Sequence, residues 1–426
     1  ELRFAGFADD WEERKLSDLF IKGGSGGTPK STNKAFYDGD IPFLGISDIT
    51  KSNGFINNTE KHISSDGLNS SAAWIVSKGA ISLAMYASVG KLAILNIDAA
   101  TSQAFYNMIF DDYDLRDLVY QRLNKANELS EWNKLISTGT QSNLNADKVK
   151  NFQMYLPKNH DEIKLISTFF KQIDNTIALH QRKLDLLKEQ KKGYLQKMFP
   201  KNGAKVPELR FAGFADDWEE RKLSEGTSKI GDGLHGTPNY SDNGDVFFIN
   251  GNNLVNGKIV ITKETKLVTE SNQSKDDKLL NMDTILMSIN GTIGNLAWYN
   301  NERVMLGKSA AYLTVSNFDK KFIFSYLQTS TIKNYFLNNL TGTTIKNLGL
   351  KTIRDTTLFV PTLEEQQKIG SLFKQLDDTI ALHQRKLDLL KEQKKGYLQK
   401  MFPKTGEKIP ELRFAGFADD WEERKL

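Results

Sequence analysis

The chain has 426 residues, of which 39% are hydrophobic and 26% are charged, and it contains no cysteine. This length and composition predict a soluble globular protein of two or more domains, and the lack of cysteine excludes disulfides and thiolate metal sites. The net charge of +4 permits nucleic-acid binding without requiring it, because such binding depends on how charges cluster. No stretch approaches the roughly 18 apolar residues of a membrane span and no signal peptide is visible, so we expect a cytoplasmic protein.

The chain opens with the segment ELRFAGFADDWEERKL, hereafter the tag, which occurs at 1–16, 208–223 and 411–426. Its aromatic residues could stack on nucleic-acid bases. We favour packing instead, because identical copies are ill suited to reading different sequences. The aromatic residues in question are Phe4, Phe7 and Trp11, with Phe211, Phe214 and Trp218 in the second copy. No variable segment follows the third tag, which could be a trace of recombination, a boundary of the expressed segment or an extension that packs on the core.

Two variable segments, about 17–157 and 224–361, share the order of their turn and strand motifs although their sequences differ. Each has a Gly-Thr-Pro turn, a Gly-Asp step into an apolar strand, an apolar strand broken by small residues, and a threonine-rich glycine loop before a final strand. The broken strands are Ile81–Ala93 and Ile285–Ala297, and the final strands end at Pro157 and Pro361. Short apolar runs bounded by Gly, Asn and Asp predict a mostly β domain with a few helices, such as Tyr113–Asn127.

A long helix is predicted after each variable segment, since residues 171–223 recur almost unchanged at 374–426. Apolar residues alternate at spacings of three and four, which is the seam of a helix that pairs with another helix. The helices most simply pair with each other, and recruitment of a different protein is the alternative. Capping boxes at Asn159 and Thr362 begin the helices, and Pro200 and Pro403 follow them. The central seam residues are Ile173, Ile177, His180, Leu184 and Leu187, then Leu376, Ile380, His383, Leu387 and Leu390.

The seam histidines, His180 and His383, could meet in an antiparallel pair and bind a metal ion. Polar residues that set the register of the helices are the favoured interpretation, so we predict no metal site. The lysine-rich stretch Lys188–Lys197 fits a solvated face, a phosphate contact or a partner surface, and the sequence does not choose among these.

These patterns predict an α+β fold with a pseudo-two-fold repeat, in which two long antiparallel coiled-coil helices join two mostly β domains. The expected boundaries are 1–157 for the first tag and domain, and 158–207 for the first helix and its linker. Residues 208–361 hold the second tag and domain, 362–410 the second helix, and 411–426 the orphan third tag.

This arrangement resembles the specificity subunit of type I restriction–modification enzymes over essentially the whole chain. The tag pattern LRFxGFxxxW and the repeated helix sequence LDLLKEQKKGYLQKMF, at 184–199 and 387–402, carry the resemblance. It implies that each domain, a target-recognition domain, reads one half of a split site in double-stranded DNA. It also implies that the paired helices act as a ruler and dock two methyltransferase subunits, to which restriction subunits are added. The complex would use S-adenosylmethionine, and ATP with Mg²⁺ for restriction.

Residues suited to reading DNA occur at matching places in the two variable segments. Polar side chains read base edges, while lysine and backbone amides hold phosphates. A single residue of this kind is more often a solvated loop residue than a DNA contact. Only the occurrence of such residues at matching places in two diverged copies supports the group as a DNA-binding set. The candidates are Lys30, Asn33, Lys34, Tyr86, Ser88, Lys91, Gln141, Ser142 and Asn143, then Asn239, Asn290, Thr292, Asn295, Thr343, Thr344 and Lys346.

No catalytic motif is evident. The chain shows no methyltransferase cofactor loop, no Asn-Pro-Pro-aromatic motif, and no phosphate loop, since Gly90-Lys91 lacks the required spacing. We therefore expect a non-catalytic subunit with no cofactor of its own. A stand-alone DNA-binding regulator and a scaffold that joins two β domains are the alternatives, and co-purification with a methyltransferase subunit separates them from the first reading.

Overall fold

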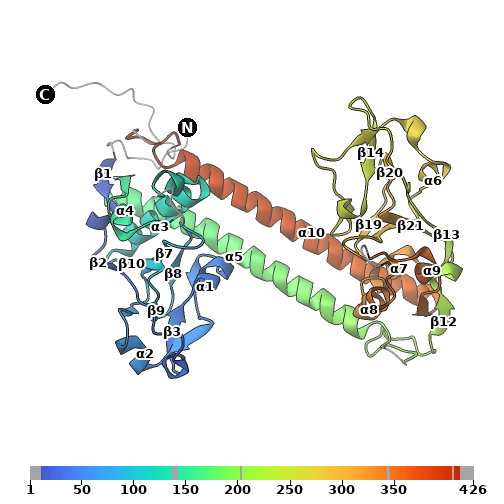
Figure 1. Cartoon of the computed structure of the whole chain (residues 1–426), viewed down its shortest axis with the longest axis horizontal. Coiled ribbons are helices and arrows are strands. Elements are labelled where there is room, and N and C mark those ends of the chain that lie inside the picture. The colour runs from blue at the N-terminus through green and yellow to red at the C-terminus, as the bar shows by residue number, and fades with distance from the viewer. Residues whose placement is uncertain (1–10, 137–142, 202–203, 343–345, 405–406, 413–426) are drawn as a thin grey trace. The chain divides into compact units, whose positions relative to one another are not determined.

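A computed structural model describes residues 11–136, 143–201, 204–342, 346–404 and 407–412. The chain divides into two compact units, Glu1–Arg182 with Arg385–Leu426 (unit 1) and Lys183–Gln384 (unit 2). Each unit therefore combines one variable segment with parts of both long helices (Figure 1).

Unit 1 contains three β-sheets and a few short helices. Its strands are β1 Glu12–Lys15, β2 Lys22–Ser25, β3 Ile41–Leu44, β4 Phe55–Ile56, β5 Lys61–Ile63, β6 Ile75–Val76, β7 Ile81–Ala84, β8 Leu92–Leu95, β9 Ala99–Thr101, β10 Phe105–Ile109 and β11 Gln153–Leu156. Its short helices are η1 Leu16–Asp18, η2 Lys34–Tyr37, α1 Ile46–Lys51, α2 Ser65–Asn69, α3 Tyr113–Glu128, η3 Glu131–Lys134 and α4 Ala146–Lys150. The sheet orders are β2-β10-β7-β8-β4, β5-β3-β9-β6 and β1-β11.

Unit 2 repeats this plan with a different sequence. Its strands are β12 Glu219–Lys222, β13 Thr227–Asp232, β14 Val246–Ile249, β15 Leu254–Val255, β16 Lys258–Ile259, β17 Leu267–Val268, β18 Thr284–Ser288, β19 Leu296–Trp298, β20 Val304–Leu306, β21 Ala310–Val315 and β22 Thr357–Val360. Its short helices are η4 Leu223–Gly226, η5 Gly251–Asn253, η6 Glu270–Asn272, α6 Lys275–Lys278, α7 Lys320–Tyr326, α8 Ser330–Asn338 and α9 Leu350–Arg354. The sheet orders are β13-β21-β18-β19, β17-β14-β20, β15-β16 and β12-β22.

The equivalent parts of the two units are a central sheet, a second sheet and a two-stranded tag sheet. In the central sheets, β7, β8 and β10 of unit 1 correspond to β18, β19 and β21 of unit 2, all paired antiparallel. In the second sheets, the parallel pair β3-β9 corresponds to β14-β20. The tag sheets are β1-β11 and β12-β22, with the same antiparallel pairing.

The long helices are α5, His160–Lys197, and α10, Leu363–Lys400, each of 38 residues. In unit 1 the beginning of α5 packs on the end of α10: the Phe169 and Tyr397 rings lie 5.1 Å apart, and Lys394 pairs with Asp174 at 2.6 Å. In unit 2 the roles are exchanged, since Lys191 pairs with Asp377 at 2.5 Å. The pairing is antiparallel in both units, because residue numbers rise along one helix as they fall along the other.

Each variable segment completes its hydrophobic core with both helices. In unit 1 the core includes Ile166 and Phe170 of α5, together with Phe402 just beyond α10. In unit 2 it includes Ile369 and Phe373 of α10, together with Phe199 just beyond α5. Burial of such large side chains stabilises a fold by about 1.5–3 kcal/mol each, so neither unit is complete without both helices.

The predicted fold class is confirmed, and so are several predicted elements. The helix predicted at Tyr113–Asn127 is α3, and the final strands before Pro157 and Pro361 are β11 and β22. The prediction of one interrupted strand at Ile81–Ala93 was wrong. This segment is a hairpin of β7 and β8, and Ile285–Ala297 likewise forms the hairpin of β18 and β19. The small and polar residues that break the apolar run form the turn.

The seam residues lie toward the helix pair in both units. Leu184 and Leu387 are buried, and the other central seam residues are partly buried: Ile173, Ile177, His180, Leu187, Leu376, Ile380, His383 and Leu390. In the part of the chain that the structure describes, no helix is both long and apolar enough to cross a membrane.

Candidate nucleic-acid interface

The turn between β7 and β8, residues 85–91, is the best-supported candidate surface in unit 1. The Leu144 amide donates to the Met85 carbonyl at 2.9 Å, so the described residues that begin at Asn143 lie against this turn. Ala87 and Ser88 have φ of 36° and 59°, a left-handed conformation that non-glycine residues seldom adopt. Strained backbone of this kind concentrates at functional surfaces.

The same turn in unit 2, residues 289–295, is held in the same way. The Leu348 amide donates to the Ile289 carbonyl at 2.9 Å, and a β-bridge joins Asn290 to Asn347. The turns close alike: the Gly90 amide donates to the Ala84 carbonyl at 3.0 Å, and the Gly294 amide to the Ser288 carbonyl at 2.8 Å. The two variable segments, whose turn and strand motifs match in sequence order, therefore also match in three-dimensional structure at these turns.

Glycine is required at position 90, because φ is +86° and an added Cβ would lie 2.4 Å from the Trp132 ring. Trp132 is buried and packs on Phe152 with ring centroids 4.6 Å apart. The turn therefore rests on a rigid aromatic base, which favours a fixed presentation of its side chains.

Both turns present exposed polar side chains. In unit 1 these are Tyr86, Ser88 and Lys91, and in unit 2 they are Thr292 and Asn295 on the turn, with Lys346 on the neighbouring loop. Hydroxyl groups and lysines of this kind can donate to base edges and phosphates without losing an internal hydrogen bond. Asn143 is half-buried beside the first turn. Asn290 is half-buried as well, and its side-chain oxygen is buried without a hydrogen-bond partner among the described residues.

Two other predicted asparagines already serve the fold. The side chain of Asn33 accepts a hydrogen bond from the Ala35 amide at 3.2 Å and so caps η2. The side chain of Asn295 donates to the Leu254 carbonyl at 3.1 Å and ties the second turn to β15. Both side chains would have to exchange these contacts to bind a base, which makes them weaker candidates.

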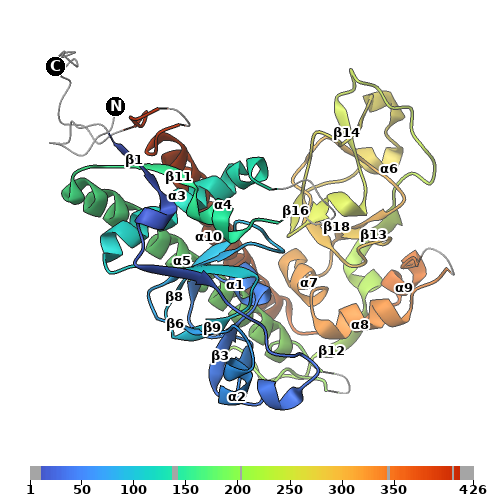
Figure 2. The same cartoon turned by 60° about the vertical axis from the view of Figure 1, so that its left-hand side comes forward.

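The structure does not bring every predicted residue to the turns. Lys30, Asn33 and Lys34 lie on the loop and helix η2 that pack on α2 and β5, beside the second sheet. Asn239 of unit 2 precedes Tyr240, which bridges to β17, so it also belongs to the second sheet. Figure 2 shows β3 and α2 at the end of unit 1 remote from β1 and β11. Gln141, Ser142, Thr343 and Thr344 lie outside the described residues.

Sequence reasoning missed two exposed residues, Gln103 and Lys308, that stand beside the turns. The Met85 amide donates to the Ala104 carbonyl at 2.7 Å, and the Ile289 amide to the Ser309 carbonyl at 2.9 Å. Gln103 and Lys308 are the residues just before these carbonyls and are exposed. No sequence motif marks them, and only the equivalent hydrogen bonds reveal that they correspond.

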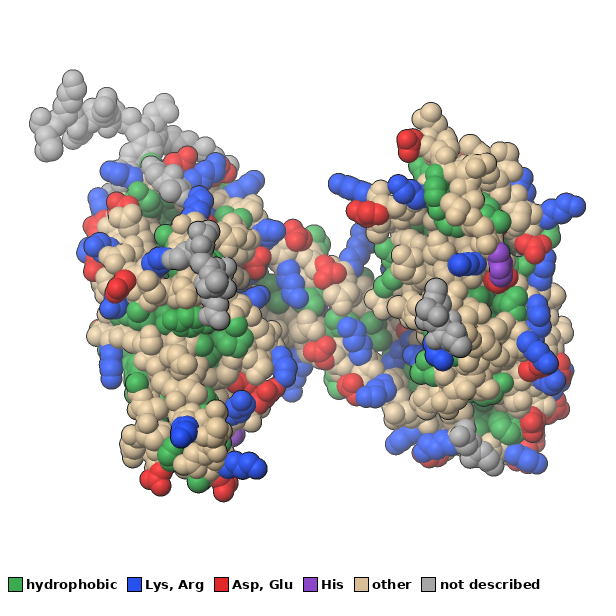
Figure 3. All heavy atoms as spheres, in the orientation of Figure 1, with side chains coloured by type: hydrophobic (Ala, Val, Ile, Leu, Met, Phe, Trp, Pro, Cys, Tyr) green, Lys and Arg blue, Asp and Glu red, His purple; other side chains and the backbone are tan. Residues whose placement is uncertain are grey.

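Charge does not gather in one patch on the side of the units that Figure 3 shows. In the view of Figure 3, basic and acidic side chains are interspersed over both units. Recognition at these turns would therefore depend on specific side chains more than on a broad basic surface.

The packing interpretation of the tag aromatics is confirmed for Trp11 and Trp218. Both are 2% exposed, and they meet Phe402 and Phe199 edge-on at 6.0 and 6.5 Å between ring centroids. Side chains buried in this way cannot stack on bases. Phe4 and Phe7 lie outside the described residues.

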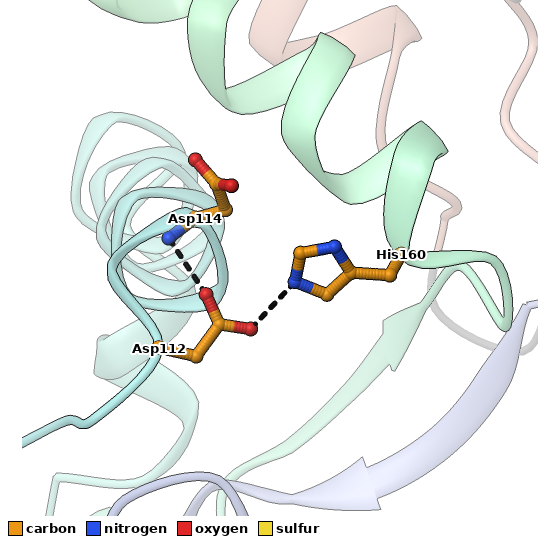
Figure 4. Close-up of side chains that lie close together, drawn as sticks. All are labelled: Asp112, Asp114 and His160. Atoms are coloured by element: carbon orange, nitrogen blue, oxygen red, sulfur yellow. Dashed lines mark hydrogen bonds and ion pairs between the residues drawn. The ribbon is translucent and has the colours of Figure 1, made fainter.

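Asp112, Asp114 and His160 form a cluster in unit 1 whose ligand atoms could share an ion (Figure 4). Asp112 caps α3 through the Asp114 and Leu115 amides, and its other oxygen lies 2.8 Å from His160 Nε2. Burial raises the pKa of Asp112, but these hydrogen bonds outweigh it and the net pKa is below the ordinary value. The cluster links the beginnings of α3 and α5, and the repeat places Leu363 where α5 has His160, so the two units do not share it.

The structure thus defines a protein with two copies of one α+β domain, each completed by an antiparallel helix pair and each presenting an equivalent polar turn. The family model of the type I restriction modification DNA specificity domain matches residues 8–189 and 215–392. The chain belongs to this family and carries the domain twice.

Curated relatives match either nearly the full chain or one part of it. The MjaIX specificity subunit of a type I restriction enzyme from Methanocaldococcus jannaschii is 24% identical over 92% of each chain. The HindI specificity subunit from Haemophilus influenzae is 29% identical over 39% of this chain and 37% of its own. Among solved structures, the S subunit from M. genitalium aligns with a TM-score of 0.63 and 16% identity, covering 93% of this chain and 96% of its own. The protein is a specificity subunit of a type I restriction–modification system.

Proposed function

We propose that each unit reads one half of a split site in double-stranded DNA through its hairpin turn. The observation that carries this proposal is the equivalence of the turns at 85–91 and 289–295, which keep the same backbone hydrogen bonds while their exposed side chains differ. Two units that share one backbone arrangement but present different side chains are suited to two different half-sites. A contiguous site would need one continuous surface instead.

The reading set on each unit comprises the exposed side chains at the turn and its neighbours. Lys91 and Lys346 would bind phosphates, which adds affinity without selecting sequence. Ser88, Thr292 and Tyr86 would contact base edges, and Lys308 would bind a base edge or a phosphate. Gln103 would contact a base edge through its amide nitrogen, because its side-chain oxygen accepts a hydrogen bond from the Thr28 hydroxyl. Lys30, Lys34 and Asn239, which lie beside the second sheets, would contact the DNA backbone flanking each half-site. As a reader of cellular DNA, the protein would work in the cytoplasm.

The chain would contribute recognition and leave catalysis to its complex. S-adenosylmethionine would be bound by methyltransferase subunits, and ATP with Mg²⁺ by restriction subunits. A methyl-transfer assay tests this division: the purified chain should transfer no label from S-adenosylmethionine to DNA, and activity should appear when a methyltransferase subunit is added. Transfer by the chain alone would contradict it.

The methyltransferase subunits would dock on exposed leucines of the long helices. Leu179 and Leu389 in unit 1, and Leu382 and Leu186 in unit 2, are between 57% and 69% exposed. The repeat makes Leu179 equivalent to Leu382 and Leu186 to Leu389. Equivalent apolar patches, one in each unit, suit two copies of the same subunit.

Replacing these leucines tests the docking proposal. The variant Leu179→Glu/Leu389→Glu should bind one methyltransferase subunit instead of two, and Leu186→Glu/Leu382→Glu should do the same. The four-fold variant should bind none, as measured by native mass spectrometry of the co-purified complex. Leu279→Glu is the matched control, because Leu279 is 65% exposed in unit 2 away from the long helices. Two bound copies in the four-fold variant would refute the docking surface.

A further inference from the structure

The first tag is held in unit 1 by residues that are distant from it in the sequence. The Trp11 amide donates to the Lys408 carbonyl at 3.3 Å, and the Trp11 ring packs on Phe402. Strand β1 then pairs with β11, from Glu12 opposite Leu156 to Lys15 opposite Gln153. We call Phe402, Lys408 and β11 the tag-binding site. It combines the segment that follows α10 with the last strand of the first variable segment, and the tag that it holds comes from the beginning of the described chain.

Unit 2 makes the same contacts, but there the tag and the helix end that it packs on belong to one continuous stretch of chain. The Trp218 amide donates to the Lys205 carbonyl at 3.3 Å, Trp218 packs on Phe199, and β12 pairs with β22. The helix ends are alike as well, because the Leu209 amide donates to the Lys197 carbonyl and the Leu412 amide to the Lys400 carbonyl, both at 2.8 Å. Unit 2 therefore demonstrates that a chain leaving a long helix can place its own tag in such a site.

The third tag has the sequence and the tether that this placement needs. Residues 411–426 are identical to 1–16 and to 208–223. Trp421 follows Lys408 by the same thirteen residues that separate Trp218 from Lys205. Since the path from Lys205 to Trp218 is sterically possible in unit 2, the same path is available from Lys408 to Trp421 in unit 1.

We propose that the first and third tags exchange at the tag-binding site of unit 1. When the third tag occupies the site, Trp421 and residues 422–425 take the places of Trp11 and β1. The first tag is then released, and with it the anchor at Leu16, whose amide donates to the Phe152 carbonyl at 2.9 Å and whose side chain is fully buried. The exchange would loosen the beginning of the first variable segment and leave unit 2 unchanged. The proposal does not depend on DNA reading.

Disulfide trapping measures which tag occupies the site. The chain has no cysteine, so each introduced pair holds the only thiols. Residues directly opposite in an antiparallel pair have Cα atoms about 4.5–5.5 Å apart, within disulfide range. Glu13→Cys with Tyr155→Cys reports the first tag, because these residues are register partners in β1 and β11. Glu423→Cys with Tyr155→Cys reports the third tag. Glu220→Cys with Phe359→Cys, register partners in unit 2, is the matched control.

We expect all three pairs to form a disulfide within one chain. Adding Trp11→Ala to the third-tag pair should raise its rate of disulfide formation by about tenfold or more, because truncating a buried tryptophan costs several kcal/mol. Absence of the Glu423–Tyr155 disulfide in the Trp11→Ala background, while the control pair forms, would overturn the proposal. A product found only between two chains would overturn it too.

Thermal unfolding supplies a second readout without cysteines. Trp11→Ala should leave the unfolding temperature of the chain nearly unchanged, because the third tag replaces the first. Trp218→Ala should lower it, since in the proposal no other tag exchanges with the second tag in unit 2. Trp11→Ala/Trp421→Ala should lower it comparably. Equal losses in Trp11→Ala and in the double variant, or no loss in either, would overturn the exchange.

Discussion

At the scale of single residues, the structure separates exposed side chains on the proposed reading turns from side chains that maintain the fold. Among the described candidates, Lys91 and Thr292 are exposed on the turns, whereas Asn33 caps η2 and Asn295 ties its turn to β15. Replacing the first pair should change DNA binding alone, and replacing the second pair should also cost stability.

Lys91→Ala tests the reading surface of unit 1. Loss of one phosphate contact should weaken DNA binding of the assembled complex and reduce the slope of log affinity against log salt by about 1. Lys78→Ala is the matched control, because Lys78 precedes β7 at the end of the hairpin opposite the turn. Titration of the specific duplex at several salt concentrations gives both slopes. Equal slopes for the two variants would remove the turn from the DNA interface.

Lys125 gives unit 1 a defined pH dependence. Its side chain is 3% exposed and donates to the Phe402 and Pro403 carbonyls at 3.0 and 3.1 Å. Burial is the main cause that lowers its pKa to about 8. Between this value and the ordinary 10.5, the unfolded chain holds a proton that the folded chain has released, so stability rises with pH.

The measurement compares urea unfolding of the parent chain and Lys125→Met from pH 8 to pH 9.5. The window ends below the ordinary tyrosine pKa, because tyrosines with raised pKa values, such as Tyr326 at about 12, oppose the trend at higher pH. The parent should gain about 1–2 kcal/mol relative to the variant across this window. A constant difference between the two chains would mean that Lys125 keeps its ordinary pKa.

At the scale of elements, the ion pairs between α5 and α10 fix how the helices meet. Lys191 pairs with Asp377 in unit 2, and Lys394 pairs with Asp174 in unit 1, with side chains between 14% and 25% exposed. These pairs are equivalent in the repeat. Lys191 and Lys394 continue the seam four residues after Leu187 and Leu390. A lysine at such a position needs a partner, since an unpaired charge in this setting is costly.

Lys191→Met should therefore destabilise unit 2 by about 2 kcal/mol, because it leaves Asp377 partly buried without its cation. The reversed pair Lys191→Asp/Asp377→Lys should recover most of the loss. Hydrogen exchange of peptides from β18 and β21 reports unit 2, and peptides from β7 and β10 in unit 1 serve as the internal control. Faster exchange in both units to the same extent would contradict a local role.

The sequence predicted the elements well where local pattern determines them. The heptad spacing and the nearly identical repeat predicted α5 and α10. The shared order of turn and strand motifs predicted two equivalent domains. The hairpins of β7-β8 and β18-β19 were missed as hairpins, because a polar break in an apolar run fits both an interrupted strand and a turn.

The candidate site was less predictable, because it depends on contacts between distant segments. The hydrogen bond from Leu144 to Met85 ties a segment about 60 residues further along the chain to the turn, and no sequence pattern specifies it. The same holds for Gln103 and Lys308. The burial of Lys125 had no signal either, since an isolated lysine in a helix is ordinarily solvated.

At the scale of the whole molecule, the chain is an internal repeat of one α+β domain and one long helix. The sequence differences between the two copies are concentrated in the two variable segments. The tag, the helices and the frame of the sheets are common, and the exposed residues at the turns are not. In the proposed function, this distribution would let one subunit supply two independent readers to a single complex, with assembly through the common parts and target choice through the variable parts.

Methylome sequencing of a domain-replacement strain tests this account most directly. Cells would express the matching methyltransferase subunit with either the parent chain or a chain whose residues 17–157 come from another specificity subunit. The account predicts a split methylated motif in which the replacement changes one half-site and leaves the other unchanged. A replacement that alters both half-sites together, or a motif with no unread spacer, would contradict it.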